Sequence, residues 1–513
     1  MRSTPAALLA AALALPALAS GDRYWVSFTD KGMAPADEAR AVAALASTYD
    51  AHAVERRRAR RSDPGLFDAR DLPPDPAYLD AVSGTGARVC QASRWLNAVS
   101  VEATPESLAA LRSLPFVASV TPVRRGRPIG GVETPVEQGF GARDVYGYAS
   151  GQLHQIGVPA VHDRGLDGAG VVIAILDTGF VTTHTAFAGL NVLASYDFVN
   201  HDGNVGIEPG DNPDQHRHGT WILGCIGSNW PNVLVGGAPG ASFVLCKTED
   251  VSSETPVEED NYVAGLEFAE AHGADLCTSS LGYIDWYTQA DLDGRTAVTT
   301  RAVNVATANG VVCVTAAGNE GHDGNPSTSH LIAPADALEV ITCGAVDEGG
   351  SIAGFSSDGP TADGRLKPEL LARGVSTFTV SSGSNDGISQ VSGTSLSTPL
   401  VASAVACLLP RFACSSVAQI RTALFSTAQR GGVADPLGVL GYGILNADAA
   451  LPADHGACDF NNDGFLDFFD YDDFVACFEG GGCPCGRTAD FNGDDFVDFF
   501  DYDAFVEAFQ TGC

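Results

Sequence analysis

The stretch Val171-Val172-Ile173-Ala174-Ile175-Leu176-Asp177-Thr178-Gly179 decides the fold of the middle of this chain. Its first six residues are all apolar, and a continuous apolar run predicts a strand that is buried on both faces, as in a parallel sheet. The run ends at Asp177, so a carboxylate lies at the carboxyl end of a buried strand, where α/β sheets place their sites. The sequence therefore predicts a functional acid at one edge of a parallel sheet.

Further apolar runs alternate with stretches of helical spacing on the carboxyl side of this strand. Strands are expected at residues 243–246, 274–278 and 311–315, and helices at 257–272 and 296–309. Alternating strands and helices indicate a mainly parallel sheet with helices on both of its faces. The predicted fold class of this region is α/β.

Three polar motifs follow at the ends of such elements. His218-Gly219-Thr220 precedes an apolar, helical run, and Asn319 lies in Ala316-Ala317-Gly318-Asn319-Glu320 after a buried strand. In Ser392-Gly393-Thr394-Ser395-Leu396-Ser397-Thr398-Pro399, Ser395 comes just ahead of an apolar helix that we expect to begin near Pro399. Singly, each motif is equally compatible with a helix cap or a turn.

Taken together, in the order Asp177, His218, Asn319, Ser395, the motifs resemble the subtilisin-like serine protease family. Asp-His-Ser is one of the chain orders in which the catalytic triad occurs. The resemblance covers about residues 152–447 and includes further matching segments at Gly236–Ala241, Ser280–Gly282 and Phe355–Pro360.

The resemblance implies a role for each of these polar residues. Ser395 would be the nucleophile, whose neutral hydroxyl needs a base at pH 7. His218 would accept its proton, and Asp177 would hold the imidazole in the required tautomer. Asn319 would donate to the oxyanion together with the Ser395 backbone N–H. His216 is a competing candidate for the base, although it lacks the following Gly-Thr.

Substrate contacts are also implied by the resemblance. Ser280-Leu281-Gly282 would form an edge that pairs with an extended peptide, and Ala316-Ala317-Gly318 would line the pocket for the residue before the scissile bond. Ile332 falls near the floor of that pocket, which suggests a modest apolar pocket. The acidic run between Glu249 and Asp260 is either a solvated helix start or a site for a basic substrate group or calcium.

The chain begins with the pattern of a secretory signal peptide. Arg2 is followed by an apolar run at 6–18 and the small-residue site Ala17-Leu18-Ala19, so residues 1–19 are the expected signal and the protein is expected to be secreted. The formal net charge of −34 argues against nucleic-acid partners and anionic membranes. No later segment is expected to reach transmembrane length. Of the 13 Cys, Cys407 and Cys414 are a candidate disulfide pair.

Residues 20–147 are expected to form a small α+β module. Strands are predicted at 24–28, 96–101 and 116–120, and a helix at 105–114 is capped by Thr104, while a polar, arginine-rich section precedes the second strand. This region resembles the inhibitory propeptide of the same family, and residues 124–147 would be the processing linker. The alternative is an ordinary N-terminal domain.

The C-terminal region contains a duplication. Residues 459–478 recur at 490–509 with 14 of 20 positions identical, and each copy has oxygen ligands at positions 1, 3, 5 and 12 of a calcium loop. The candidate calcium ligands are Asp459, Asn461, Asp463 and Asp470 in the first copy, and Asp490, Asn492, Asp494 and Asp501 in the second. At position 6, Gly464 is replaced by Asp495, which tolerates a left-handed turn at some cost.

One loop and one helix, duplicated, resemble a dockerin-type module, whose partner would be a cohesin-like domain or a surface receptor. The alternative is an acidic disordered tail, but regularly spaced Phe and Tyr argue against it. Five Cys in this short region predict at least one disulfide within it.

The sequence thus predicts a secreted subtilisin-like serine endopeptidase that cleaves protein or peptide substrates and is inhibited by its own propeptide. The expected parts are a signal at 1–19, a propeptide with its linker at 20–147, a catalytic domain at 148–453 and a small helical calcium module at 454–513. The alternatives are a catalytically silent peptide-binding scaffold, an exopeptidase of the same family, and a tail that only stabilises the enzyme.

Overall fold

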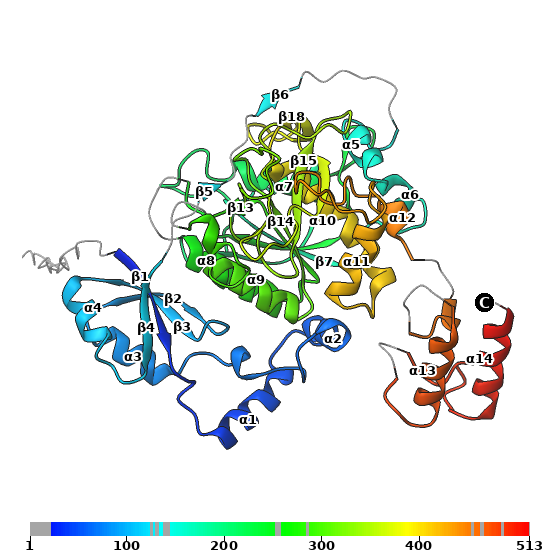
Figure 1. Ribbon diagram of the computed structural model, residues 1–513, viewed down its shortest axis with the longest axis horizontal. Coiled ribbons are helices and arrows are strands. Elements are labelled where there is room, and N and C mark those ends of the chain that lie inside the picture. The colour runs from blue at the N-terminus through cyan, green and yellow to red at the C-terminus, as the bar shows by residue number, and fades with distance from the viewer. Residues whose placement is uncertain are drawn as a thin grey trace, which may run out of the picture.

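The computed structural model describes residues 22–123, 127–128, 133–136, 144–251, 258–283, 287–452, 456–461, 466–483 and 487–511. The expected signal peptide, part of the linker and the candidate ligand Asp463 lie outside the described residues. Figure 1 shows an N-terminal α+β body in blue, a central α/β body from cyan to yellow, and a pair of helices near the C-terminus in red.

The central body is built on a seven-stranded sheet with the order β16-β15-β14-β12-β7-β11-β8. Every neighbouring pair in this sheet is parallel, which confirms the predicted fold class. The strands are β7 (Val172–Asp177), β8 (Asn191–Asp197), β11 (Ser242–Lys247), β12 (Leu276–Ser279), β14 (Val312–Ala316), β15 (Ile341–Val346) and β16 (Leu370–Arg373).

Helices cover both faces of the sheet. One core contains Ile173 and Ile175 of β7 with side chains of α7 (Arg217–Gly227) and α10 (Thr394–Leu408). The other core contains the alternate β7 residues Val172, Ala174 and Leu176 with α8 (Glu258–Ala271) and α9 (Val298–Ala308). Successive strand residues point to opposite faces, so a strand covered on both sides must be apolar throughout.

Smaller elements complete the central body: α5 (Ser150–Gln155), α6 (Val158–His162), β9 (Asn229–Trp230), β10 (Leu234–Val235), β13 (Leu281–Gly282), β17 (Thr377–Val380), β18 (Ile388–Val391), α11 (Val417–Thr427) and α12 (Ala447–Ala450). Among the described residues, one helical segment, Thr394–Phe412, is long and apolar enough to cross a membrane. The expectation that no later segment reaches that length is therefore wrong. This segment is 89% buried inside the protein, so it is a core helix of the sheet.

The N-terminal body has a four-stranded antiparallel sheet with the order β2-β3-β1-β4. Its elements are β1 (Asp22–Phe28), α1 (Pro35–Ala44), α2 (Ala51–Arg60), α3 (Pro76–Ser83), β2 (Arg88–Ser93), β3 (Ala98–Ala103), α4 (Pro105–Leu111) and β4 (Val117–Pro122). The cap of α4 is confirmed, because Thr104 Oγ1 accepts from the Ser107 N–H at 3.3 Å. The sequence missed β2 and the helices α1 to α3.

The C-terminal body is two helices, α13 (Phe468–Phe478) and α14 (Phe499–Thr511), which pack through stacked Phe474 and Phe505 rings 4.0 Å apart. The Cys477–Cys483 disulfide confirms the staple expected in this region. The candidate pair of Cys407 and Cys414 is wrong. Cys407 keeps its thiol, which donates to the Gly237 carbonyl at 3.1 Å inside the core.

Candidate active site

An aspartate and a histidine meet at the carboxyl edge of the central sheet. Asp177 is the last residue of β7, and His218 lies in the first turn of α7. His218 Nδ1 donates to Asp177 Oδ1 at 2.8 Å, and both side chains are buried. With the proton on Nδ1, the other ring nitrogen, Nε2, is the one that can accept a proton.

A glycine allows α7 to approach this edge. A Cβ atom at Gly219 would lie 2.3 Å from the carbonyl oxygen of Gly179 and 3.1 Å from Asp177 Cβ. The helix therefore reaches the turn after β7 only because residue 219 has no side chain. Thr220 makes a second contact between α7 and the segment after β7, since its Oγ1 accepts from the Val181 N–H at 2.9 Å. The His-Gly-Thr motif thus has a packing reason at each position.

The two other histidines of the region occupy different places. His216 is the N-cap residue of α7, and burial lowers its pKa. The imidazole bonded to Asp177 belongs to His218, so the geometry favours His218 over His216 as the base. His184 is buried and holds the chain locally, with Nδ1 accepting from the Ala186 N–H and Nε2 bonded to the Gly387 carbonyl.

Ser395 is the second residue of α10, which begins at Thr394 and not near Pro399 as expected. Pro399 therefore lies inside the helix, and it has no N–H to donate to the carbonyl of Ser395, four residues earlier. Ser280 supplies that hydrogen bond, because its Oγ donates to the Ser395 carbonyl at 3.0 Å. The expected substrate edge is in this way fixed to the turn that carries the candidate nucleophile.

Asn319 follows β14 and is oriented by the same helix terminus. The Thr394 N–H donates to Asn319 Oδ1 at 2.9 Å. Because the start of α10 holds the amide oxygen as an acceptor, the amide nitrogen, which is a donor, points away from that contact. That is the orientation which an oxyanion donor requires.

The expected substrate edge is paired with the linker. β13 (Leu281–Gly282) forms an antiparallel pair with β5 (Arg127–Pro128). A second linker segment, β6 (Thr134–Pro135), pairs with β18, the strand that leads into the Ser395 turn. Between them, the Glu133 carboxylate accepts from Ser389 Oγ at 2.6 Å and from Arg217 at 3.1 Å.

The residues expected to line a pocket are close to Ile332. Ala316 and Ala317 are fully buried, and Gly318 has a φ of +122°. A Cβ atom at Gly318 would lie 2.6 Å from Ser357 Oγ and 3.3 Å from Ile332 Cγ1, so a side chain there would fill this space. Ile332 also lies against Gly282, where an added Cβ would come within 1.9 Å of its Cδ1.

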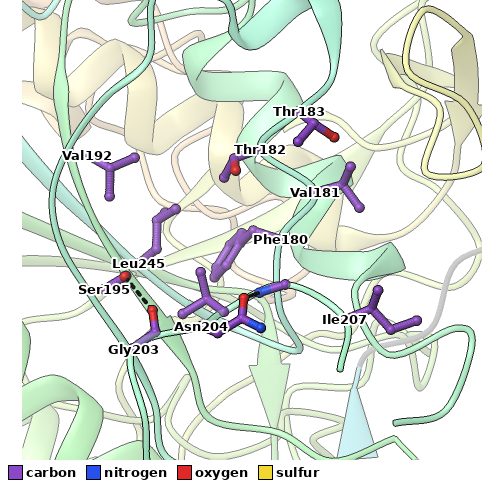
Figure 2. Close-up of a pocket in the computed structure, with 12 residues that line it drawn as sticks. Phe180, Val181, Thr182, Thr183, Val192, Ser195, Gly203, Asn204, Ile207 and Leu245 are labelled. Carbon is purple, nitrogen blue, oxygen red and sulfur yellow. Dashed lines mark hydrogen bonds between the residues drawn. The ribbon is translucent and has the colours of Figure 1, made fainter. Parts of the chain in front are cut away.

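A cavity of about 440 Å³ lies beside this site and not at it. Figure 2 shows its wall, formed by residues that follow Asp177 along the chain, by β8 and by the loop after it. Its lining includes Phe180, Val192 and Ile207, but none of the four candidate catalytic residues. We assign no role in the reaction to this cavity.

Glu249, Glu259 and Asp260 of the acidic run are buried, so these three residues do not form a solvated helix start. Glu249 is 1% exposed and accepts from Tyr283 Oη at 2.6 Å. Glu259 is buried against Tyr287, and Asp260 bonds to Arg23 of the N-terminal body at 3.0 Å. The sequence could not reveal this, because the partners come from distant parts of the chain.

Two groups of acidic residues and histidine were not anticipated from the sequence. Among the described residues, the side chains of Asp197, Asp202 and Glu208 offer ligand atoms within 4.8 Å of one another, and so do Asp323, His330 and Asp358. In the first group the Lys247 ammonium is 2.8 Å from Asp197, so a cation is already present there. The first group lies at the end of β8 and in the loop directly after it, whereas Asp358 of the second group is 28 residues from His330.

The second candidate calcium loop is closed by hydrogen bonds of its own. Asp501, at position 12, turns back to accept the Phe491 and Asn492 N–H groups at 2.8 and 3.0 Å, so the last ligand is held beside the first ones. Asp490 accepts from the Asp494 N–H at 3.0 Å, and Asp495 has the left-handed φ of +70°. In the first loop, Asp470 accepts from the Asn461 N–H at 3.2 Å. Carboxylate and amide oxygens of this kind fit a calcium ion.

Comparison with known proteins agrees with this architecture. The subtilase family model, peptidase S8, matches residues 168–443, and a model of the peptidase S8 propeptide domain from Bacteroidota matches residues 23–131. The chain is 30% identical over 372 residues to subtilisin E of Bacillus subtilis, covering 72% of this chain and 85% of that one. It is 34% identical over 292 residues to subtilisin DY of Bacillus licheniformis, covering 56% and 94%.

A solved structure is also similar, that of fervidolysin from Fervidobacterium pennivorans, a keratinolytic enzyme related to subtilisin. The TM-score is 0.59 at 26% identity, and the match covers 74% of this chain and 60% of that chain. The fold and the site therefore define a subtilisin-like serine protease. The chain belongs to the subtilase family, and an S8 propeptide domain precedes its catalytic domain.

Proposed function

We propose that this protein is a secreted serine endopeptidase whose catalytic residues are Asp177, His218, Ser395 and Asn319. The observation that carries the proposal is the buried hydrogen bond of 2.8 Å between His218 Nδ1 and Asp177 Oδ1 at the carboxyl edge of the sheet. It is supported by Thr394, whose N–H orients Asn319 beside the helix terminus that carries Ser395.

The proposed reaction uses these groups in the usual order of acyl transfer. Ser395 Oγ attacks the scissile carbonyl while His218 Nε2 takes its proton, and the C–N bond breaks as that proton passes to the leaving amine. Asp177 stabilises the imidazolium, and Asn319 with the Ser395 N–H stabilises the oxyanion. Water, deprotonated by His218, then hydrolyses the acyl-enzyme.

The pairing of the linker with the catalytic domain favours endopeptidase activity over exopeptidase activity. β5 pairs with β13, while residues 133–136 continue the chain beside β18, so an internal segment is accommodated along this edge. An exopeptidase needs a barrier or a charged group that captures a chain end. The apolar surroundings of Ile332 favour a modest apolar side chain before the scissile bond.

The same pairing supports inhibition by the propeptide. We assign residues 20–147 to the propeptide and its linker, 148–453 to the catalytic domain, and 454–513 to the C-terminal module. While β5 occupies the edge of β13, a substrate cannot add a strand there. Activation then requires a cut in the linker, residues 124–147, and loss of the propeptide.

The C-terminal module is proposed to bind calcium and to dock the enzyme. The ion would be held by Asp459, Asn461, Asp463 and Asp470 in the first loop, and by Asp490, Asn492, Asp494 and Asp501 in the second. Phe468, Phe469, Phe499 and Phe500 are 65–69% exposed at the starts of α13 and α14. Large exposed aromatic side chains support a partner surface, such as a cohesin-like domain or a surface receptor.

The test of the enzymatic proposal is the full-length chain with Ser395→Ala, incubated with casein beside the wild type. We expect hydrolysis to fall roughly 10⁶-fold and the precursor to stay uncut, because the nucleophile is lost. A fluorophosphonate should label the wild type alone. Ser392→Ala is the matched control, since Ser392 Oγ accepts from the Ser376 N–H and has no proposed part in the reaction.

The products distinguish the remaining alternatives. Internal fragments of casein support an endopeptidase, whereas stepwise loss from chain ends would indicate an exopeptidase. An unlabelled, inactive wild type, freed of its propeptide, would indicate a silent peptide-binding scaffold.

Calcium binding is tested on the full chain by calorimetric titration. Asp501→Asn should weaken binding, because this buried carboxylate holds the second loop closed. Asp503→Asn, on the exposed side of α14, should leave the titration unchanged. Equal titrations for the two variants would contradict the assignment.

A further inference from the structure

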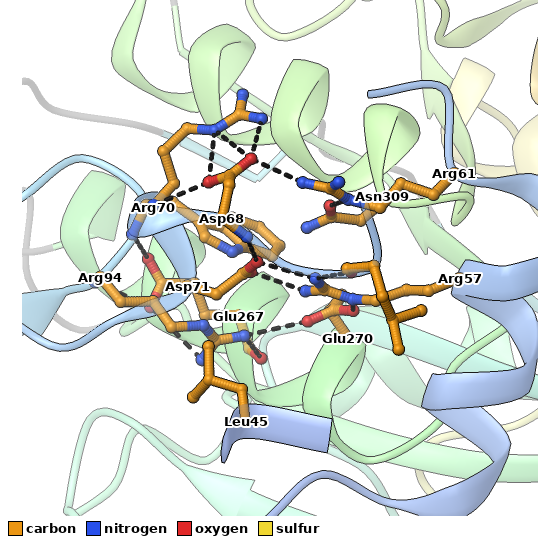
Figure 3. A network of polar contacts seen from close by, with 12 residues as sticks. Leu45, Arg57, Arg61, Asp68, Arg70, Asp71, Arg94, Glu267, Glu270 and Asn309 are labelled. Carbon is orange, nitrogen blue, oxygen red and sulfur yellow. Dashed lines mark hydrogen bonds and ion pairs between the residues drawn. The ribbon is translucent and has the colours of Figure 1, made fainter. Parts of the chain in front are cut away.

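The arginine-rich stretch of the propeptide is a buried helix that docks on the catalytic domain. Arg56 and Arg57 lie on α2, and their guanidinium groups are 0% exposed. Arg56 donates to the Ala274 carbonyl at 2.7 Å and pairs with Glu270, while Arg57 Nε donates to Glu270 Oε1 at 2.8 Å. Figure 3 shows Arg57 and Glu270 in a continuous network with other charged groups.

A residue of the propeptide itself holds one of these arginines in place. Asp71 accepts two hydrogen bonds from Arg57, at 2.7 and 2.8 Å, so this guanidinium is fixed by its own domain before it meets Glu270. Arg94, at the end of β2, reaches the other oxygen of Glu270 at 3.1 Å. Three arginines of the propeptide therefore converge on one buried carboxylate of α8.

A second carboxylate lies beside the first. Asp275 bonds to His52 Nε2 at 2.7 Å and lies 3.6 Å from the Arg60 guanidinium. Arg61 Nε donates to Asn309 Oδ1 at 3.0 Å, and the Ser62 N–H donates to the Ala308 carbonyl at 2.9 Å. The contact thus continues beyond the end of α2.

This contact is at the opposite edge of the sheet from the candidate active site. Asp275 precedes β12, and its Oδ2 accepts from the N–H of Val172, the first residue of β7. Asp177 is the last residue of the same strand, and a strand rises about 3.3 Å per residue, which separates the two edges by about 17 Å. A cut in the linker at the carboxyl edge leaves these amino-edge contacts intact.

The propeptide arginines compensate the charge of the buried Glu270 carboxylate. Burial by itself would raise the pKa of Glu270, but Arg56, Arg57 and Arg94 outweigh it and lower that pKa. Glu270 is therefore a buried anion whose charge is compensated by the propeptide. Removing one partner of such a buried pair is strongly destabilising, because the other charge is left without compensation.

We propose that α2, with Arg56, Arg57, Arg60 and Arg61, is an arginine clamp that keeps the cut propeptide bound to Glu270 and Asp275. The partner that this acidic surface fits is the arginine-bearing helix of the chain's own propeptide. The proposal rests on the proposed precursor function only in assuming that the linker is cut.

The experiment separates binding from proteolysis. The full chain carries Ser395→Ala and, in the linker, an inserted recognition sequence for a site-specific protease, which makes the cut from outside. The dissociation rate of the cut propeptide is then followed by size-exclusion chromatography of timed samples. Because no activity of the chain is needed, failure of the proposed enzymatic function leaves this result unaffected.

The comparison uses three arginines of the same helix. Arg56→Gln with Arg57→Gln should raise the dissociation rate about 100-fold or more, since two buried ion pairs are lost. Arg58→Gln is the matched control, because the Arg58 guanidinium is 60% exposed and pairs with Glu55 of its own helix. Its dissociation rate should change less than about twofold, as exposed pairs contribute little.

A variant in the catalytic domain serves as a control for misfolding of the propeptide. Glu270→Gln should also raise the dissociation rate, and thermal unfolding of each uncut chain reports whether it is folded. Equal rates for the Arg56/Arg57 double variant and for Arg58→Gln would overturn the proposal. So would immediate loss of the wild-type propeptide after the cut, or equally tight binding of an unrelated arginine-rich helix to the freed catalytic domain.

Discussion

Two Asp–His pairs lie at opposite edges of the same sheet, and their hydrogen bonds are nearly the same length. His218 is 2.8 Å from Asp177 at the carboxyl edge, and His52 is 2.7 Å from Asp275 at the amino edge. The His218 side chain is 8% exposed, whereas that of His52 is 44% exposed. The His218–Asp177 pair lies within the catalytic domain, whereas the His52–Asp275 pair joins the propeptide to the catalytic domain.

The difference shows that the distance between an acid and an imidazole does not define a catalytic site. Next to the carboxyl-edge pair are a helix terminus with Ser395 and an oriented amide at Asn319. Next to the amino-edge pair are Arg56 and Arg60, whose positive charges stabilise the Asp275 carboxylate. By our proposals, the neighbours of each pair decide its use, which is catalysis at one edge and attachment at the other.

The same substitution at both edges gives the largest expected contrast. Asp177→Asn should lower kcat about 10⁴-fold, because the imidazole loses the group that fixes its tautomer. Asp275→Asn should leave kcat of the enzyme freed of its propeptide within a few-fold of the wild type. The measurement is peptide hydrolysis by the two variants. An equal loss in both would mean that the amino-edge acid also supports the active site.

Asn319→Ala should lower kcat by about 10²–10³-fold with little change in KM, because the amide acts on the oxyanion. Asn325→Ala is the control in the following loop, where its side chain accepts hydrogen bonds from Ser327. Steady-state kinetics on a peptide substrate separate the two parameters. A rise in KM with unchanged kcat would assign Asn319 to substrate binding.

Ser280→Ala should lower kcat roughly fivefold, the effect of one hydrogen bond of ~1 kcal/mol. The Ser395 carbonyl loses the donor that replaces the missing N–H of Pro399. Ser280→Thr keeps a hydroxyl and should restore most of the rate if the hydroxyl alone matters. Equal rates for Ser280→Ala and the wild type would contradict this positioning role.

The smallest expected effect is a pH dependence of propeptide release. The hydrogen bond to Asp275 raises the pKa of His52, although burial and Arg56 oppose the shift and Asp50 adds to it. Its contribution to binding is therefore complete below about pH 6.5 and is lost as the pH rises through the raised pKa. The pKa values of Glu270 and Asp275 are lowered, so their contributions are lost only as the pH falls through those values.

Release of the cut propeptide should therefore become a few-fold faster between pH 6 and pH 9, and His52→Gln should remove that dependence. The dissociation assay described for the arginine clamp measures it. The other charged groups that line the same cavity as His52 are Arg60 and Glu55. A pH dependence that persists in His52→Gln would assign it to another group.

Much of the catalytic domain could be predicted because its signals are local. The apolar run at 171–176 became β7, and the four polar motifs lie at the ends of the elements that the sequence predicts there. The start of α10 was misjudged because Pro399 is normally found in a first turn. Its place inside the helix depends on Ser280, 115 residues away in the chain.

The propeptide was harder to predict for a definite physical reason. By pattern, a helix with Arg56, Arg57, Arg58 and Arg60 is polar on every side and should be exposed. Two of these arginines are fully buried because Glu270, 214 residues away, compensates their charge. Asp260 of the acidic run shows the same effect, since it finds Arg23 only in the folded chain.

The sequence by itself determined the α/β class, the order of the candidate catalytic motifs and the duplication of the acidic C-terminal loops, because each depends on spacing within a short segment. Only the tertiary structure decided which histidine meets Asp177, how the amide of Asn319 is turned, and where the arginines of α2 are buried. Those outcomes depend on charge and hydrogen-bond partners that are distant in the chain. A buried polar group must find a partner, and only the fold determines which one it finds.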